Sequence, residues 1–583
     1  MLLAVLCLAL LCPVVYAAAP PPAGKTIVDQ WMKQLTLAEK AAQLVFVPIY
    51  GDNPHPRSKA WRATRSAITD LKAGGLILLN RVRGGVVQRA EPYQTAAFLN
   101  RVQKLSKLPL LIGGDFERGA SMRFNGVPQY PHLMAFGAAN DPALTRAFGL
   151  ATAREARALG FHWVYAPVSD VNNNPDNPII NIRSFGESPQ LVAAHVEAFI
   201  QGARSDPANR VLLTVKHFPG HGDTATDSHL GLGVVSASKE RLEQVELTPF
   251  RAAIAAGVDS VMTAHLSVPA LEPEPIPATV SKNIITGLLK ESLGFKGIIS
   301  TDAMDMQGLA KLYPPGEAAV RALEAGVDVL LVPADARAAV NAVVEAVRTK
   351  RIPRARLEES VRKVLAAKVS MGLHRRRLVN LEGLGESLDS PEENDIAASA
   401  AARAITLVKN DGGLIPLDKA ARGCFFVLSG NRFSTQGRDL TESLRAAAPN
   451  AMVALLDPLL PAETFKEHAG TAEPCSYAAV FTFVAAAAYQ GSVSLPGGYP
   501  GFVESLIATG KPVAMISMGN PYLLRAFPKV SAYVAAFSTA APSEQAVLKA
   551  LFGEAPVSGK LPVSIPGIAG LGFGIVLEQK PVQ

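Results

Sequence analysis

One short stretch of the chain, residues 216–229, gathers three histidines, two aspartates and one lysine in the order KHFPGHGDTATDSH. Side chains of these types are suited to proton transfer. The stretch follows an apolar, β-branched run, residues 211–215, and is broken by glycine and proline, so it predicts a strand that opens into a loop. A solvated polar loop is the simpler interpretation of a charge cluster. A position directly after a buried strand, where α/β enzymes carry their chemistry, favours a catalytic loop.

A second candidate for chemistry is Asp302, which ends the apolar run 297–301. A carboxylate there can act as a nucleophile or stabilise a cationic transition state. The alternative is an N-cap, with Asp302 or Asp305 opening the next helix; we expect the nucleophile. Asp227 and His229, two residues apart in the loop, suit a dyad in which the carboxylate orients and charges the imidazole.

Charged residues also follow other predicted strands. Their guanidinium, ammonium and carboxylate groups can hold a polyhydroxylated or anionic ligand. They are Asp115, Arg123, Arg183 and Lys216.

A zinc site is a competing interpretation, because His217, His221, Asp223 and His229 are all of metal-binding types. Their spacing matches no zinc pattern, and the chain has no HExxH motif, so we expect no metal. No GxxxxGK[ST] motif follows a strand here, so the sequence does not predict a phosphate-binding loop of that type.

Apolar runs alternate with amphipathic helical patterns over residues 26–377. The predicted strands are residues 43–49, 75–79, 108–113, 162–168, 211–217, 260–266, 297–301 and 327–332. Near-continuous apolar strands between helices indicate a parallel sheet covered on both faces. Eight such units predict a (β/α)8 TIM-type barrel, with a doubly wound open sheet as the alternative. In a barrel, the polar residues at the strand ends would share one face.

A polar segment, residues 378–393, is interpreted as a linker to a smaller α/β sandwich domain, residues 394–583. The strands expected there are residues 424–428, 452–456, 478–484, 513–517 and 532–537. Cys424 and Cys475 have no metal-type spacing, and one disulfide or two free thiols are equally consistent with the sequence.

The composition indicates a globular protein, with 49% hydrophobic and 18% charged residues. The formal charge of +7 is spread without a basic run, which argues against nucleic acid or a membrane surface as a partner. Residues 1–19 form an apolar run that ends in small residues, so we expect a cleaved signal peptide and an exported, periplasmic or extracellular protein. An uncleaved membrane anchor is the alternative; no later segment predicts a membrane helix. Nothing in the sequence fixes the oligomeric state.

The KHFPGHGD motif of residues 216–223, followed by Asp-Ser-His at 227–229, resembles glycoside hydrolase family 3, specifically its two-domain β-N-acetylglucosaminidase branch. The blocks Arg-Ser-Phe-Gly at 183–186 and Ser-Thr-Asp-Ala-Met at 300–304 are also similar to that family. The resemblance covers the whole barrel, and the trailing domain is similar to the family's C-terminal domain. The long motif is the specific part of the resemblance.

The resemblance implies a role for each candidate residue. Asp302 corresponds to the nucleophile, and His229, helped by Asp227, to the acid/base. The residues that would hold the terminal N-acetylglucosamine are Asp115, Arg123, Arg183, Lys216 and His217. One block departs from the family pattern: residues 115–120 read Asp-Phe-Glu-Arg-Gly-Ala instead of Asp-Gln-Glu-Gly-Gly-Arg, which puts one arginine contact in doubt.

The implied activity is that of a retaining exo-β-N-acetylglucosaminidase without metal or cofactor. Its substrates would be peptidoglycan fragments or chitooligosaccharides that end in N-acetylglucosamine. The alternatives are a β-glucosidase of the same family, a phosphorylase, and a catalytically silent sugar-binding or cell-wall-binding protein. A histidine acid/base does not repel an anionic acceptor, which keeps the phosphorylase open.

Overall fold

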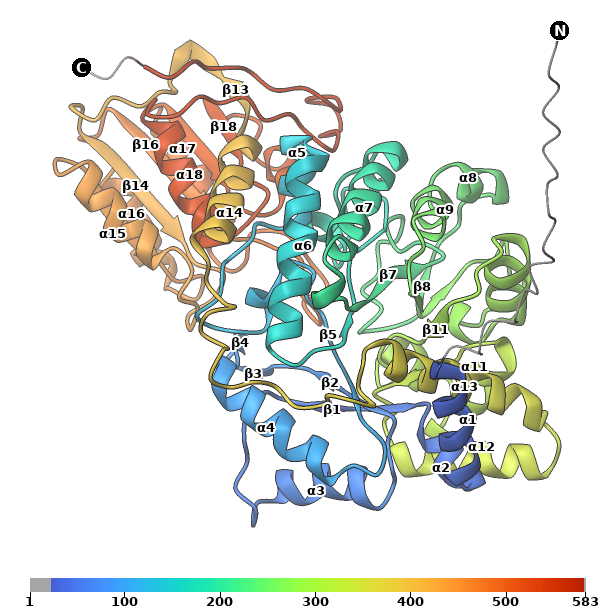
Figure 1. Cartoon of the computed structure of the whole chain (residues 1–583). Helices are drawn as coiled ribbons and strands as arrows, with labels where there is room; N and C mark the ends of the chain where they lie inside the picture. Colours follow the sequence, from blue (N-terminus) through green and yellow to red (C-terminus); the bar gives the residue numbers. More distant parts are fainter. Residues whose placement is uncertain (1–22, 581–583) are drawn as a thin grey trace, which may run out of the picture.

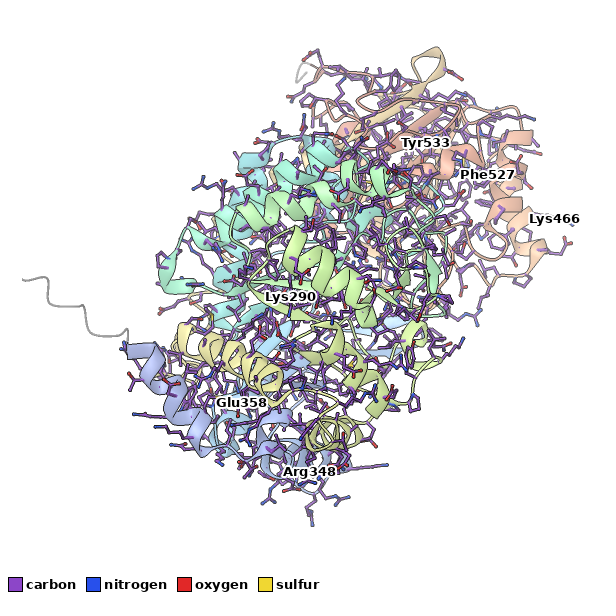
Figure 2. All side chains as sticks on the ribbon, turned by 90° about the vertical axis from the view of Figure 1, so that its right-hand side faces the viewer. Lys290, Arg348, Glu358, Lys466, Phe527 and Tyr533 are labelled. Atoms are coloured by element: carbon purple, nitrogen blue, oxygen red, sulfur yellow. A yellow bond between two sulfur atoms is a disulfide. The ribbon has the colours of Figure 1, made fainter. Side chains whose placement is uncertain are left out.

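The computed structural model describes residues 23–580, so the predicted signal peptide lies outside the described part of the chain. Two α/β domains lie against each other (Figure 1), the first ending near residue 370 and the second beginning with the helix α14 (Pro391–Ala404). The view from the side (Figure 2) places Lys290, Arg348 and Glu358 on the first domain and Lys466 and Tyr533 on the second.

The first domain is the predicted barrel. Its strands are β1 (Val45–Ile49), β2 (Gly75–Leu78), β5 (Leu111–Gly114), β6 (Trp163–Val164), β7 (Leu212–Phe218), β9 (Ser260–Thr263), β11 (Ile298–Ser300) and β12 (Leu330–Leu331). They pair in parallel in the order β11-β9-β7-β6-β5-β2-β1-β12. A parallel bridge between Ser300 and Val329 brings β11 back to β12 and closes the ring. The predicted barrel is confirmed, and the open-sheet alternative is wrong.

Helices surround this ring. They include α1 (Ala23–Gln34), α2 (Leu37–Ala42), α3 (Lys59–Thr69), α4 (Pro92–Leu105), α5 (Leu133–Ala139), α6 (Pro142–Ala158), α7 (Pro189–Arg204), α8 (Lys239–Gln244), α9 (Leu247–Ala255), a π-helix η5 (Asn283–Ser292), α10 (Gln307–Ala310), α11 (Pro315–Ala325), α12 (Ala336–Arg348) and α13 (Arg354–Ser370). The sequence favours one helix over residues 239–256, but the structure has two, α8 and α9. In a continuous helix the ring of Pro249 would clash with the carbonyl of Val245, where α8 ends.

Large aromatic side chains fill the barrel interior. Phe46 and Trp163 meet edge to face at 5.5 Å, and the Trp163 indole N–H donates to Thr214 Oγ1 over 2.6 Å. A Cβ on Gly75 would lie 2.3 Å from the Phe46 ring, so only glycine leaves room for that ring. The interior is therefore packed solid, and the chemistry must lie at an end of the barrel.

Two short strand pairs were not expected from the sequence. β3 (Arg81–Arg83) and β4 (Val86–Gln88) form a hairpin after β2, and β8 (Gly233–Val234) pairs in parallel with β10 (Leu266–Ser267). The second pair follows the predicted catalytic loop directly and fixes its far end to the segment after β9.

The second domain is a six-stranded sheet between helices. Its strands are β13 (Thr406–Asn410), β14 (Gly423–Leu428), β15 (Met452–Leu456), β16 (Tyr477–Thr482), β17 (Val513–Ser517) and β18 (Ala532–Ala535), in the order β13-β18-β17-β16-β14-β15. The helices include α15 (Arg438–Ala447), α16 (Ala462–Gly470), α17 (Tyr499–Ala508) and α18 (Ala541–Leu551). The five expected strands are present, and β13, antiparallel to β18, is one the prediction missed.

The segment expected to be a linker forms turns up to Ser390, whose side chain caps α14. The last three residues of that segment are therefore already helical. α14 contacts α5 and α6 of the barrel as well as α18 of the second domain. The chain between the domains is thus packed against both of them.

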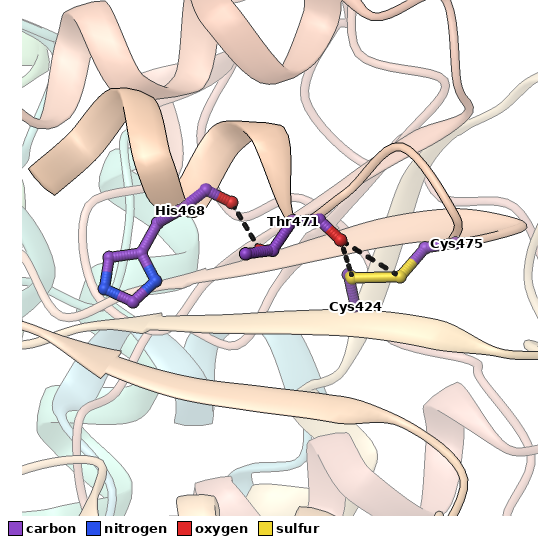
Figure 3. The surroundings of a disulfide bond; sticks show 4 residues. All are labelled: Cys424, His468, Thr471 and Cys475. Atoms are coloured by element: carbon purple, nitrogen blue, oxygen red, sulfur yellow. Dashed lines mark hydrogen bonds between the residues drawn. A yellow bond between two sulfur atoms is a disulfide. The ribbon is translucent and has the colours of Figure 1, made fainter. Parts of the chain in front are cut away.

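A disulfide joins Cys424 at the start of β14 to Cys475 just before β16 (Figure 3), which decides between the two alternatives left by the sequence. Both cysteines are buried. Within residues 23–580, no helix has both the length and the apolar character that a membrane span requires.

Candidate active site

All eight candidate site residues lie at the carboxyl end of the barrel or in the loops that leave it. Asp115 directly follows β5, Lys216 and His217 belong to β7, and Asp302 stands two residues after β11. Arg183 ends a short 3-10 helix, η2 (Asn181–Arg183), between β6 and α7. Arg123, Asp227 and His229 come from the loops after β5 and β7.

A network of buried charges joins the ends of β5, β6 and β7. Lys216 Nζ lies 2.7 Å from Asp115 Oδ1 and 2.7 Å from Glu117 Oε1. Arg123 binds Asp115 at 2.7 Å, and Arg183 grips both oxygens of Glu117 at 2.8 and 2.9 Å. Buried ions need partners of this kind, because an unpaired charge in the interior is costly.

The pKa values in the network follow from this pairing. Burial raises the pKa of Asp115, but Lys216 and Arg123 outweigh it and hold the carboxyl below its ordinary value. Burial lowers the pKa of Lys216, but Asp115 and Glu117 raise it more. The lysine therefore stays charged and the two carboxylates stay ionised.

Glu117 is a site residue that sequence reasoning missed. It lies within the block that departs from the family pattern, and it is the shared partner of Lys216 and Arg183. Burial raises its pKa, yet Arg183 and Lys216 hold it well below the ordinary value. The Asp-x-Glu spacing could have revealed it, because it places two carboxylates directly after the same strand.

A second missed residue, Asp170, organises the loop after β7. Its buried carboxylate accepts hydrogen bonds from the backbone N–H groups of His217 and His221 and from His217 Nδ1, the last over 2.7 Å. His217 Nε2 then lies 3.4 Å from the Arg183 guanidinium. Asp170 thus fixes both the course of the loop and the orientation of the His217 ring.

Asp227 and His229 form the predicted dyad. Asp227 Oδ1 accepts from His229 Nδ1 over 2.8 Å and from the His229 backbone N–H over 2.9 Å. Asp227 Oδ2 accepts from the backbone N–H of Tyr489, a residue of the second domain, over 2.9 Å. Burial raises the pKa of Asp227, but these hydrogen bonds outweigh it and lower the pKa below its ordinary value. His229 Nε2 is the ring nitrogen that remains for a substrate.

Asp302 is influenced by Lys216 and by three histidines of the site. Burial raises its pKa, but His217, His265, His229 and Lys216 together hold it below the ordinary value. The N-cap alternative is not supported: the cap position of α10 is Met306, without a side-chain cap bond, and Asp302 Oδ1 instead accepts from the Ala303 N–H at 2.7 Å. An ionised carboxylate at a strand end near a histidine is suited to nucleophilic attack.

The four side chains considered for zinc do not converge. His217 is held by Asp170, His221 Nε2 lies 2.9 Å from Ser228 Oγ, and His229 is held by Asp227. Among the described residues, no group of three or more His, Cys, Asp or Glu side chains has the arrangement of a metal site.

Comparison with known proteins covers both domains. Residues 36–367 match the glycosyl hydrolase family 3 N terminal domain, and residues 405–571 match the family's C-terminal domain. A beta-N-acetylglucosaminidase/beta-glucosidase of Cellulomonas fimi is 30% identical over 82% of this chain and 88% of its own length. Beta-hexosaminidase A of Pseudoalteromonas piscicida is 33% identical over 61% of this chain and 64% of its own.

Solved structures agree. The family 3 beta-N-acetylglucosaminidase of Paenibacillus sp. str. FPU-7 is 33% identical, covers 91% of this chain and 99% of its own, and superposes with a TM-score of 0.80. The beta-glucoside phosphorylase BglX is 25% identical, covers 94% of this chain and 97% of its own, and superposes with a TM-score of 0.82. The family expected from the KHFPGHGD motif is confirmed, and the chain belongs to glycosyl hydrolase family 3 and is a glycoside hydrolase that acts on a carbohydrate substrate.

Proposed function

We propose that this protein is a retaining exo-β-N-acetylglucosaminidase in which Asp302 is the nucleophile and His229 the acid/base. The observation that carries the proposal is the pairing of an ionised carboxylate after β11 with a nearby histidine whose Nδ1 is held by Asp227. The relatives named beta-N-acetylglucosaminidase and beta-hexosaminidase support the choice of sugar.

In the first step, an oxygen of Asp302 attacks the anomeric carbon. The bond to the glycosidic oxygen breaks, and that oxygen takes the proton from His229 Nε2. The product is a glycosyl ester on Asp302, and the sugar's configuration is inverted once. Asp227 supports this step, because its negative charge stabilises the imidazolium form of His229 that must donate the proton.

In the second step, His229 takes a proton from a water molecule, which attacks the anomeric carbon. The ester bond to Asp302 breaks, the carboxylate is restored, and the second inversion gives net retention. His229 ends the cycle protonated and ready for the next substrate.

We propose that the buried charge network binds the hydroxyl groups of the substrate. Arg123, Asp115 and Lys216 present fixed donors and acceptors at the ends of β5 and β7. Because these groups are already paired with one another, they need little reorganisation when a sugar binds. Arg183 and His217, joined at 3.4 Å, complete the proposed binding set.

We further propose that the enzyme is exported and removes terminal N-acetylglucosamine from peptidoglycan fragments or chitooligosaccharides. The apolar segment at residues 1–19 supports export. The disulfide in the second domain is consistent with an oxidising compartment.

The direct test compares 4-nitrophenyl N-acetyl-β-glucosaminide with the matching β-glucoside. We expect turnover of the acetamido substrate in preference to the glucoside. Asp302→Ala removes the nucleophile and should abolish release of 4-nitrophenol. His229→Ala should lower the rate on a substrate with a poor leaving group by about 10²–10⁴-fold. Preference for the glucoside would overturn the sugar assignment, and full activity of folded Asp302→Ala would overturn the mechanism.

Phosphorolysis is the second candidate function. Two points favour keeping it: the proposed acid/base is a histidine, which does not repel phosphate, and one similar solved structure is a beta-glucoside phosphorylase. A phosphorylase would release N-acetylglucosamine 1-phosphate at a rate that rises with phosphate. A hydrolase releases free N-acetylglucosamine, and added phosphate leaves its rate unchanged.

A further inference from the structure

The second domain reaches the proposed dyad through the connection between β16 and α17. We call residues 485–492 of this connection the bridging loop. Its tip is exposed, and Tyr489 keeps 58% of its surface accessible. The backbone N–H of this tyrosine nevertheless donates to Asp227 Oδ2 over 2.9 Å, and its ring centroid lies 5.0 Å from that of His229 at an angle of 61°.

One of these contacts holds Asp227, and the other holds His229. Asp227 uses Oδ1 for His229 and Oδ2 for the Tyr489 N–H, so both oxygens of the carboxylate are occupied. The edge-to-face contact then restricts how the His229 ring turns about its side chain. Asp227 and His229 are thus fixed from outside the barrel as well as from within their own loop.

The base of the bridging loop is fixed in the second domain. Val493 and Leu495 are buried in the core of that domain. Asn520 closes the base from both sides, since its backbone N–H donates to Val484 O over 2.7 Å and its Nδ2 donates to Val493 O over 2.8 Å. The tip therefore has a rigid support from which to position a neighbour.

The backbone of Tyr489 is in the left-handed region, with φ of 67°. A side chain with a Cβ is disfavoured there, and glycine is the residue that ordinarily occupies such a position. The chain instead carries a large aromatic residue that is more than half exposed, so burial of the ring does not offset this cost. Strained residues of this kind concentrate at functional sites.

Carboxylates of the proposed site influence the Tyr489 hydroxyl. Burial raises the pKa of this phenol, and the negative charges of Asp305, Asp227 and Asp302 raise it further.

We propose that Tyr489 is a positioning residue for proton donation, with its backbone N–H holding Asp227 and its ring holding His229. This inference rests on the proposed role of His229 as acid/base. It gives the second domain a direct part in catalysis: the barrel supplies the reacting groups, and the second domain keeps the proton donor in place.

The test uses two substrates that differ in their need for a proton. The leaving sugar of N,N′-diacetylchitobiose must be protonated, whereas the phenolate of 2,4-dinitrophenyl N-acetyl-β-glucosaminide leaves without a proton. Tyr489→Gly removes the ring, retains the N–H and suits the positive φ. We expect it to lower kcat/KM on chitobiose about tenfold, with less than about a twofold change in kcat/KM on the dinitrophenyl glycoside, because kcat/KM reports only the steps up to formation of the glycosyl ester.

Three matched variants sharpen this test. Tyr489→Phe retains the ring and should keep both activities. Phe433→Gly removes another exposed aromatic ring of the second domain, one that packs on Gly84 of the barrel, and should also keep both. Replacing residues 487–491 by two glycines shortens the loop, so that no backbone N–H of its tip reaches Asp227, and should lower kcat/KM on chitobiose more than Tyr489→Gly does.

The outcomes separate this inference from the proposed function. An equal fall of Tyr489→Gly on both substrates, or no fall on chitobiose, overturns the positioning role while His229→Ala still shows the difference between substrates. If His229→Ala itself shows no such difference, the acid/base assignment fails and the positioning role fails with it.

Discussion

At the scale of single residues, Lys216 is the centre of the charge arrangement. Its ammonium group is buried and lies 2.7 Å from each of two carboxylates, Asp115 and Glu117. Burial alone would lower the pKa of this lysine, so its charge depends on those two partners. The cluster is accordingly preorganised, because each of its ions already has its counter-charge before a sugar arrives.

The first prediction concerns the acidic limb of the pH profile. Burial raises the pKa of Asp302, and His217 is the largest of the positive influences that lower it. His217→Asn retains a donor for Asp170 but removes the imidazole that helps to lower the pKa of Asp302. The pKa of Asp302 should therefore rise. We expect the acidic limb of kcat/KM to move to higher pH.

The measurement is kcat/KM against pH for 2,4-dinitrophenyl N-acetyl-β-glucosaminide, with thermal unfolding to verify that His217→Asn is folded. An unmoved limb, or one that moves to lower pH, would contradict the assignment of Asp302 as the ionised nucleophile whose charge His217 supports.

At the scale of elements, the sequence predicts those structures that have a strong local pattern. All eight barrel strands coincide with apolar runs. The amphipathic patterns predict helices over residues 189–204 and 336–348, and α7 and α12 have these bounds. The missed strands are the short pairs β3–β4 and β8–β10, which have two or three residues each, and the edge strand β13. The short pairs form through tertiary contacts, and two or three residues contain no periodicity that could reveal them. β13 has five residues, as many as β1, so its length does not explain why it was missed.

The disulfide allows a test at this scale. It links β14 to the turn before β16 and closes a loop across 51 residues of the chain. Closing a loop of this length stabilises the folded state by roughly 4 kcal/mol, since it restricts the unfolded chain. We expect the double variant Cys424→Ala, Cys475→Ala to lose stability of that order in thermal or denaturant unfolding.

The reductant serves as the control for this prediction. Dithiothreitol should lower the unfolding midpoint of the wild type and leave that of the double variant unchanged. If the wild type is insensitive to full reduction, the bond does not contribute as described.

At the scale of the whole molecule, the two domains share one hydrophobic cluster and a set of polar contacts. Ile182, Met134 and Ala135 of the barrel pack with the core of the second domain. Asn181 Nδ2 donates to Asn520 Oδ1 over 3.2 Å. The second domain therefore contacts the two residues that precede Arg183, Asn181 and Ile182.

This contact between the domains predicts that replacing either of two fully buried isoleucines by alanine lowers stability, but that only one replacement lowers kcat/KM. Ile182→Ala in the shared cluster and Ile68→Ala in α3, on the barrel alone, should each cost about 2–4 kcal/mol of unfolding free energy. Only Ile182→Ala should also lower kcat/KM, because it loosens the support of Arg183. Equal kcat/KM for the two variants at 25 °C would show that the domain contact does not reach the site.

The candidate site could be predicted from the sequence only where residues share a motif or end a strand. Asp302, Asp227 and His229 have such positions, and the structure brings them together at one end of the barrel. Asp170 and Tyr489 could not be found in this way. They act through contacts with residues that are 47 and 262 positions away in the chain, and no local pattern contains that information.

Peptide mass spectrometry of the enzyme, after reaction with a 5-fluoro N-acetyl-β-glucosaminyl substrate, would identify the nucleophile directly. The fluorine slows both steps, and a good leaving group lets the first step proceed, so the glycosyl ester accumulates. We expect the label on the carboxylate of Asp302. A label on Asp305 or Asp227 would contradict this assignment. A first-formed product whose anomeric configuration is inverted relative to the substrate would contradict the retaining mechanism.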